Sequence, residues 1–79
     1  MTETLDTLRE ALINAIREIN DDVERYQAIK RFESQLETDL KQEKAGIANR
    51  LYEGRSWNAV GKLLGVTGSR AEQISRGAR

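Results

Sequence analysis

The chain has 79 residues, 38% of them hydrophobic and 33% charged, and its 13 basic and 13 acidic residues cancel to a formal net charge of zero. A chain this short makes one small domain with a thin core, and the absence of cysteine and histidine excludes disulfides, thiolate metal sites and histidine-based catalysis. No apolar run approaches the ~20 residues that span a bilayer and no secretory signal is visible, so we expect a cytoplasmic protein without metal or cofactor. The absence of proline favours an all-α fold.

The first predicted element is an amphipathic helix near the N-terminus. Its apolar residues recur three and four positions apart, as one face of a helix requires. Thr2 or Thr4 can cap its start, and the run Asn20-Asp21-Asp22 breaks the pattern and offers a cap for the next helix. The stripe consists of Leu5, Leu8, Leu12, Ile16 and Ile19.

A longer helix is predicted from about Asp22 to Glu53, and Gly54 ends it. The polar segment 41–44 interrupts its apolar spacing, and Gly46 permits a bend or a break at a cost of about 1 kcal/mol relative to alanine. The stripe before the polar segment consists of Tyr26, Ile29, Phe32, Leu36 and Leu40. This stripe and the first one can pack as a helical hairpin within one chain, between two copies, or in both ways.

Two short helices follow, predicted over residues 57–64 and 68–76 and joined by a sharp turn. Ser56 and Thr67 are residue types that cap helix starts, and Gly65 supplies the positive φ that the turn needs. A helix pair of this shape can place its second helix in the major groove of DNA. The residues predicted to hold the pair together are Trp57, Val60, Gly61, Leu64, Gly65, Val66, Ala71 and Ile74.

Two of these positions have a specific expected role. Gly61 has almost no side chain, so the second helix of the pair can cross close to the first. Trp57 can either stack on nucleic acid or form a lid on the core beside Val60 and Leu64, and we favour the lid. Tyr52 can pack at the margin of the same core or bind a phosphate, and the sequence does not decide between these.

The charges are unevenly distributed along the chain. Residues 1–40 contain ten acidic and five basic side chains, whereas residues 41–79 contain three acidic and eight basic ones. Phosphates respond to the local field within a Debye length of ~8 Å, so the basic half can bind nucleic acid although the net charge is zero. We therefore expect acidic helices for packing or dimerisation over residues 1–42, a basic helix-turn-helix region over residues 43–79, and one folded unit made of both.

The helix over residues 68–76 has a predicted buried side and a predicted DNA-facing side. At ~100° per residue, Ala71 and Ile74 mark the buried side, and the polar residues point away from it. Gln73 is a strong candidate for reading a base, because an amide pairs bidentately with adenine. Glu72 repels phosphate unless it accepts from a cytosine amino group or pairs with a neighbouring arginine. The predicted base-reading residues are Gly68, Ser69, Glu72, Gln73 and Arg76, and the predicted phosphate contacts are Arg55, Lys62, Thr67, Arg70 and Arg79.

Residues 54–67 fit the pattern Gly-x-Ser-Trp-x-x-[Ile/Val]-Gly-x-x-Leu-Gly-Val-[Ser/Thr]. On these residues the chain resembles the helix-turn-helix of small bacterial and phage transcription regulators, and it is similar to the DNA-binding region of sigma factors. The resemblance covers roughly the last third of the chain. It implies transcription control. From this resemblance together with the residue patterns above, we expect a nucleoid-associated regulator that binds double-stranded DNA sequence-specifically, as a dimer.

Three alternatives from other classes remain open. The acidic helices could bind a protein partner, as an antitoxin does. The chain could contact RNA polymerase while it touches promoter DNA, or it could be an architectural or recombination accessory protein with weak sequence preference. We do not expect an enzyme, because the acidic residues have no histidine, cysteine or glycine-rich phosphate loop with which to build a catalytic site.

Overall fold

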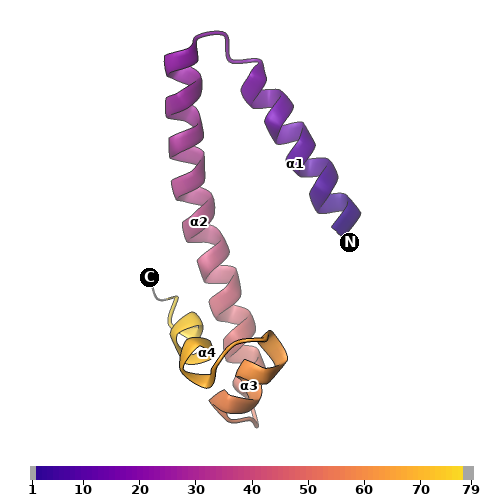
Figure 1. The fold of residues 1–79 in the computed structure, drawn as a ribbon, viewed down its shortest axis with the longest axis vertical. Helices are drawn as coiled ribbons and strands as arrows, with labels where there is room; N and C mark the ends of the chain where they lie inside the picture. The colour runs from indigo at the N-terminus through magenta and orange to yellow at the C-terminus, as the bar shows by residue number, and fades with distance from the viewer. Residues whose placement is uncertain (1, 78–79) are drawn as a thin grey trace. The chain divides into compact units, whose positions relative to one another are not determined.

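The computed structural model describes residues 2–77, which form four α-helices and no strand (Figure 1). The helices are α1 (Thr2–Arg17), α2 (Asp22–Tyr52), α3 (Trp57–Leu64) and α4 (Gly68–Ser75). The predicted all-α fold is confirmed, and so are the bounds of α3. α2 passes Gly46 without interruption, and α2 and α4 each end one residue earlier than predicted.

The chain divides into two compact units, and α2 belongs to both. The first unit contains α1 and the part of α2 that ends at Gln35. The second unit begins at Leu36 and contains the rest of α2 together with α3 and α4. All residues predicted to contact DNA come after this division in the chain, so the second unit is the one that carries the candidate site.

α1 begins earlier than the sequence indicated. Thr2 and Thr4 both lie within the helix, so the prediction that one of them caps its start is wrong. Glu3 stands in the first turn, where the helix dipole stabilises an acidic side chain. The helix therefore extends upstream of the apolar stripe from which its start was estimated.

Hydrogen bonds close the connection between α1 and α2 in the first unit. Oδ2 of Asp21 accepts the N–H of Glu24 at 2.9 Å, which confirms the predicted acidic cap of α2. The guanidinium of Arg25 donates to the carbonyl oxygen of Ile19 at 2.7 and 3.0 Å and to that of Arg17 at 3.2 Å. Carbonyl groups at the end of a helix lack helical donors, so Arg25 satisfies two acceptors at the end of α1 and just beyond it.

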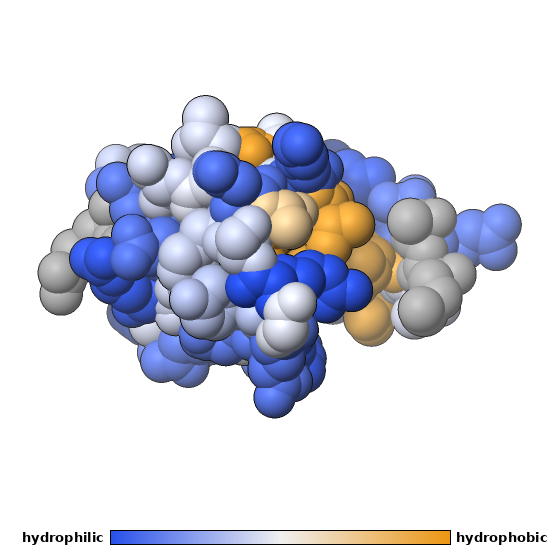
Figure 2. All heavy atoms as spheres, turned by 90° about the horizontal axis from the view of Figure 1, so that it is seen from below, coloured by the Kyte–Doolittle hydropathy of each residue, from blue (hydrophilic) through white to orange (hydrophobic). Residues whose placement is uncertain are grey.

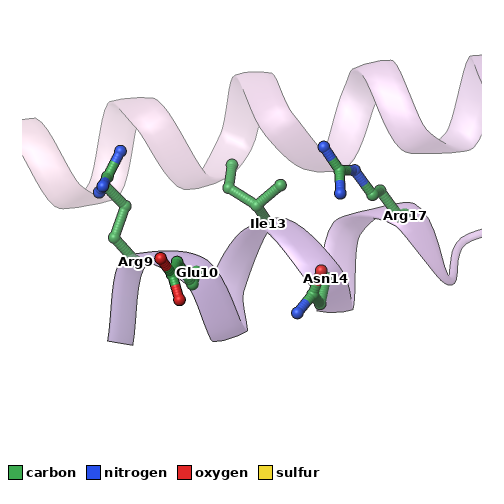
Figure 3. Close-up of a pocket in the computed structure, with 5 residues that line it drawn as sticks. All are labelled: Arg9, Glu10, Ile13, Asn14 and Arg17. Carbon is green, nitrogen blue, oxygen red and sulfur yellow. The ribbon is translucent and has the colours of Figure 1, made fainter. Parts of the chain in front are cut away.

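The two predicted apolar stripes are unevenly covered. The half-buried members are Leu12, Ile16, Ile19, Ile29 and Phe32, and the exposed members are Leu5, Leu8, Tyr26, Leu36 and Leu40. On an adjacent side of α1, Arg9, Ile13 and Arg17 project together (Figure 3) and line a shallow depression with Glu10 and Asn14. The exposed members leave apolar surface available for a further contact.

The core of the second unit is built from small side chains. Ala48 from α2, Val60 from α3 and Ala71 from α4 are fully buried, and Gly61 is buried next to Val60 in the sequence. Small residues let helices approach closely, so backbone contact sets much of the packing here. The burial of Ala71 fixes which side of α4 faces inward.

Candidate nucleic-acid interface

Two capping side chains and one glycine shape the connection between α3 and α4. Oγ of Ser56 accepts the N–H of Ala59 at 3.2 Å, and Oγ1 of Thr67 accepts the N–H of Arg70 at 3.1 Å. Both predicted caps are therefore confirmed. Gly65 ends α3 with a φ of 76°, the left-handed conformation predicted for the turn.

Gly61 faces the backbone of this connection. A Cβ atom at this position would lie 2.6 Å from the carbonyl oxygen of Val66 and 2.8 Å from the carbonyl carbon and oxygen of Thr67. No side chain fits there unless the backbone moves. The close approach predicted for Gly61 is present, and it is made to the connection between the helices rather than to α4 itself.

Gly68, at the start of α4, has a neighbour within its own unit. A Cβ atom here would meet the side chain of Asn58 and would lie 3.1 Å from its backbone nitrogen and 3.2 Å from its Cα. Gly68 is half-buried, and packing against α3 therefore already accounts for a glycine at this position. Contact between Gly68 and a DNA duplex stays a prediction.

Asn49 of α2 anchors the end of α4. Its Nδ2 donates to the carbonyl oxygen of Ser75 and to that of Ala45 in its own helix, each at 2.9 Å. Because the last carbonyls of a helix have no helical donor, this amide satisfies one of them and positions α4 against α2. Nothing in the sequence pattern singled out Asn49, since a polar residue on a helix surface has the same signature whether it faces solvent or a neighbouring helix.

α4 presents a polar stripe on the side opposite its buried alanine. Ser69, Gln73 and Arg76 are exposed, whereas Ala71 is fully buried. The three exposed residues are spaced by four and three, which places them on one side of the helix. Glu72 is half-buried, and its Oε2 lies 3.0 Å from Nη2 of Arg76. Glu72 thus has the neighbouring arginine that would offset its repulsion of phosphate.

The other residues predicted to contact phosphate have different surroundings. Arg55 donates from Nη1 to the carbonyl oxygen of Leu51 at 3.0 Å, so it also closes the end of α2. Lys62 is exposed on α3, and the hydroxyl of Thr67 is engaged as the cap of α4. Arg79 lies outside the described residues. Lys62 makes no ion pair among residues 2–77.

Arg70 lies beside a second basic residue. Arg70 from α4 and Lys44 from α2 line the same depression, and neither makes an ion pair among residues 2–77. Lys41 lines this depression too, but its Nζ lies 3.1 Å from a carboxylate oxygen of Glu37. Arg70 and Lys44 are therefore the two cations here that are available to an anionic ligand.

The two aromatic residues of the second unit pack on each other. Tyr52, the last residue of α2, and Trp57, the first residue of α3, stack with their ring centroids 3.9 Å apart. Trp57 is half-buried and Tyr52 is 42% exposed. The stack gives Trp57 a structural role at the edge of the core and gives Tyr52 a partner that the sequence did not identify.

Comparison of the chain with protein-family models, with curated proteins and with solved structures found no match. Within residues 2–77, no helix has both the length and the apolar character needed to cross a membrane. The function is accordingly inferred from the chemistry of the site.

Proposed function

We propose that the chain binds double-stranded DNA sequence-specifically, with α3 and α4 acting as a helix-turn-helix and α4 entering the major groove. The observation that carries this proposal is the two-sidedness of α4, which exposes Ser69, Gln73 and Arg76 and buries Ala71. A glutamine amide pairs with adenine, an arginine guanidinium pairs with guanine, and serine is permissive. These are the residue types and the orientation that a recognition helix requires.

Phosphate contacts would supply most of the affinity. Residues 36–79 carry eight basic and five acidic side chains, and Arg70, Lys44 and Lys62 stand around the helix pair without ion-pair partners among the described residues. The contact between Glu72 and Arg76 lowers the field of the one acidic residue on α4. The second unit can therefore approach a polyanion although the whole chain is neutral.

The proposal includes a homodimer that regulates transcription at the nucleoid, without a cofactor and without enzymatic activity. One eight-residue helix reaches few base pairs, so a second copy that contacts a half-site ~34 Å away strengthens binding and specificity. The acidic N-terminal helices, arranged as a hairpin, supply the dimer contacts in this proposal. The exposed apolar residues available for them are Leu5, Leu8, Tyr26, Leu36 and Leu40.

Selection from a randomised duplex pool by the purified full-length chain, at low and at near-physiological salt, tests the proposal. We expect a palindromic motif with half-sites about one DNA turn apart. The preference at one base position of each half-site should be lost with the Gln73→Ala variant, and the whole motif should be kept with the Gln42→Ala variant, which changes an exposed residue of α2. Enrichment of DNA without a shared sequence motif would contradict sequence-specific regulation and indicate an architectural role. No retention of DNA even at low salt would overturn the proposal and favour a protein-binding role, as in an antitoxin or a polymerase-contacting factor.

A further inference from the structure

We propose that an apolar groove in the second unit receives the N-terminal helix of a second copy of this chain, so that two copies exchange their α1 segments. The inference rests on the dimer of the proposed function and specifies its contact as α1 of one copy against the second unit of the other; this contact does not depend on DNA binding. It rests on the lining of the groove, on the exposed stripe of α1 and on the opposite charges of the two units.

The groove lies among α2, α4 and the end of α3, and its volume is about 340 Å³. It is lined by Lys44, Ile47, Leu64, Val66, Arg70 and Ile74. Figure 2 shows one face of the molecule, on which apolar side chains are exposed beside hydrophilic ones. Ile47 is 42% exposed and Leu64 36% exposed, so the larger apolar side chains of this unit remain open to solvent beside a core of small ones.

An apolar groove with charged residues at its edge is the usual receptor for one face of an amphipathic helix. Such a helix anchors itself through apolar residues at positions i, i+3 and i+7. In α1, Leu5, Leu8 and Leu12 have this spacing. Leu5 is 68% exposed and Leu8 is 60% exposed, so α1 carries apolar side chains that can fill the groove.

Charge complementarity favours this occupant. Residues 1–35 contain eight acidic and five basic side chains, and residues 36–79 contain five acidic and eight basic ones. Lys44 and Arg70 line the groove and have no ion-pair partner among residues 2–77. Opposite charges around an apolar contact steer the encounter and set its orientation, and here they match the first unit of one copy to the second unit of another.

A reciprocal exchange closes the assembly at two copies. Each copy carries this groove and the exposed stripe of α1, so two copies related by a two-fold axis can fill both grooves with both α1 stripes. Ser69 and Gln73 do not line the groove, so the exchange leaves the exposed stripe of α4 free. The dimer therefore leaves these two base-reading residues accessible, whereas Arg70 and Lys44 line the groove and would be shared between the partner's α1 and a phosphate. The dimer can be measured in the absence of DNA.

Sedimentation equilibrium of the full-length chain provides the first test. Ile47→Gln, Leu64→Gln and Leu8→Gln should each raise the dissociation constant of the dimer about tenfold or more, because each removes a large apolar side chain from the contact. Leu63→Gln is the matched control, since Leu63 is 58% exposed on α3 and does not line the groove; it should change the constant by less than about twofold. A chain that is monomeric at all concentrations, or a dimer unaffected by the Leu8 and Ile47 changes, would overturn the proposal.

Cysteine cross-linking provides the second test and does not depend on the stability of the polar variants. The chain has no cysteine of its own, so a Leu8→Cys copy and an Ile47→Cys copy can be mixed and oxidised. We expect a disulfide between the two different copies that forms much faster than the one between Leu8→Cys and Leu63→Cys copies. A disulfide that forms only within a single copy carrying both changes would show that α1 fills the groove of its own chain. Equal rates of disulfide formation in the two mixtures would show that the groove is not part of the dimer contact.

Discussion

Tyr52 and Trp57 stack face to face, with ring planes inclined by 7° and centroids 3.9 Å apart. The stack joins the end of α2 to the start of α3 across a connection in which Gly54 has a φ of 73°. Stacked aromatic pairs stabilise a fold beyond the area that they bury. Among the described residues of this unit the fully buried side chains are two alanines and a valine, so the stacked pair adds large apolar groups to a core of small ones.

Trp57→Ala should lower the free energy of unfolding by about 2 kcal/mol, because it removes a half-buried ring and its stacking contact with Tyr52. Tyr52→Ala should cost less, and the double variant should show a coupling of about 0.5–1.5 kcal/mol. Urea unfolding followed by circular dichroism measures these values. Tyr26→Ala is the control, since Tyr26 is 62% exposed in the first unit. A Trp57→Ala variant with unchanged stability and weakened DNA binding would instead make Trp57 a nucleic-acid contact.

Two glycine-to-alanine changes should have opposite effects. Gly61→Ala should destabilise the chain by about 2 kcal/mol, because its Cβ would meet the backbone of Val66 and Thr67 at 2.6–2.8 Å. Gly46→Ala, inside α2, meets only the mobile end of the Arg50 side chain at 3.3 Å and should stabilise by up to about 1 kcal/mol through helix propensity. Thermal unfolding of the two variants measures both effects. Melting temperatures that shift equally and in the same direction would contradict the close approach at Gly61.

Gln73→Ala and Arg70→Ala should weaken DNA binding in different ways. Loss of the Gln73 amide should cost about 1–3 kcal/mol at one base position and leave non-specific binding nearly unchanged. Loss of Arg70 should weaken binding to every sequence and reduce the salt slope by about one phosphate contact. Titrations of a selected duplex and a scrambled duplex at several salt concentrations separate the two effects. Arg31→Ala, an exposed arginine of the first unit, is the control for Arg70, and equal losses on both duplexes would remove the base-reading role of Gln73.

Glu72→Gln should tighten binding to all DNA sequences several-fold at low salt, because it removes the acidic charge of α4 and releases the guanidinium of Arg76. The stability of the fold should change by no more than about 0.5 kcal/mol, since both side chains of the ion pair are partly exposed to solvent and the pair spans one helical turn. Fluorescence anisotropy with a labelled duplex measures the affinity. Weaker binding to one sequence only would indicate that Glu72 accepts a hydrogen bond from a base.

The local structure of the second unit could be predicted from the sequence because its determinants act over a few residues. Ser56, Thr67 and Gly65 cap or turn the chain through their own side-chain chemistry or backbone freedom. The exposure of Ser69 and Gln73 follows from helical periodicity alone. The pair Glu72 and Arg76 likewise follows from a spacing of four.

Contacts between helices could not be predicted in the same way. The amide of Asn49 reaches the carbonyl of Ser75 across 26 positions of the chain, and no periodicity encodes such a pair. The groove was missed for a related reason. Helical spacing marks Leu64 and Ile74 as apolar positions that need cover, but it does not reveal that the neighbouring helices leave them partly open.

The small residues at the centre of the second unit have a consequence for how such a chain can diverge. Ala48 and Ala71 are fully enclosed and have no side-chain rotamers with which to absorb an added methyl group. A larger residue at Ala71 could be accommodated by a shift of α4, which would re-aim its outer stripe without replacing any residue on it. Two descendants with identical outer surfaces could therefore acquire different binding preferences through changes that no ligand ever touches.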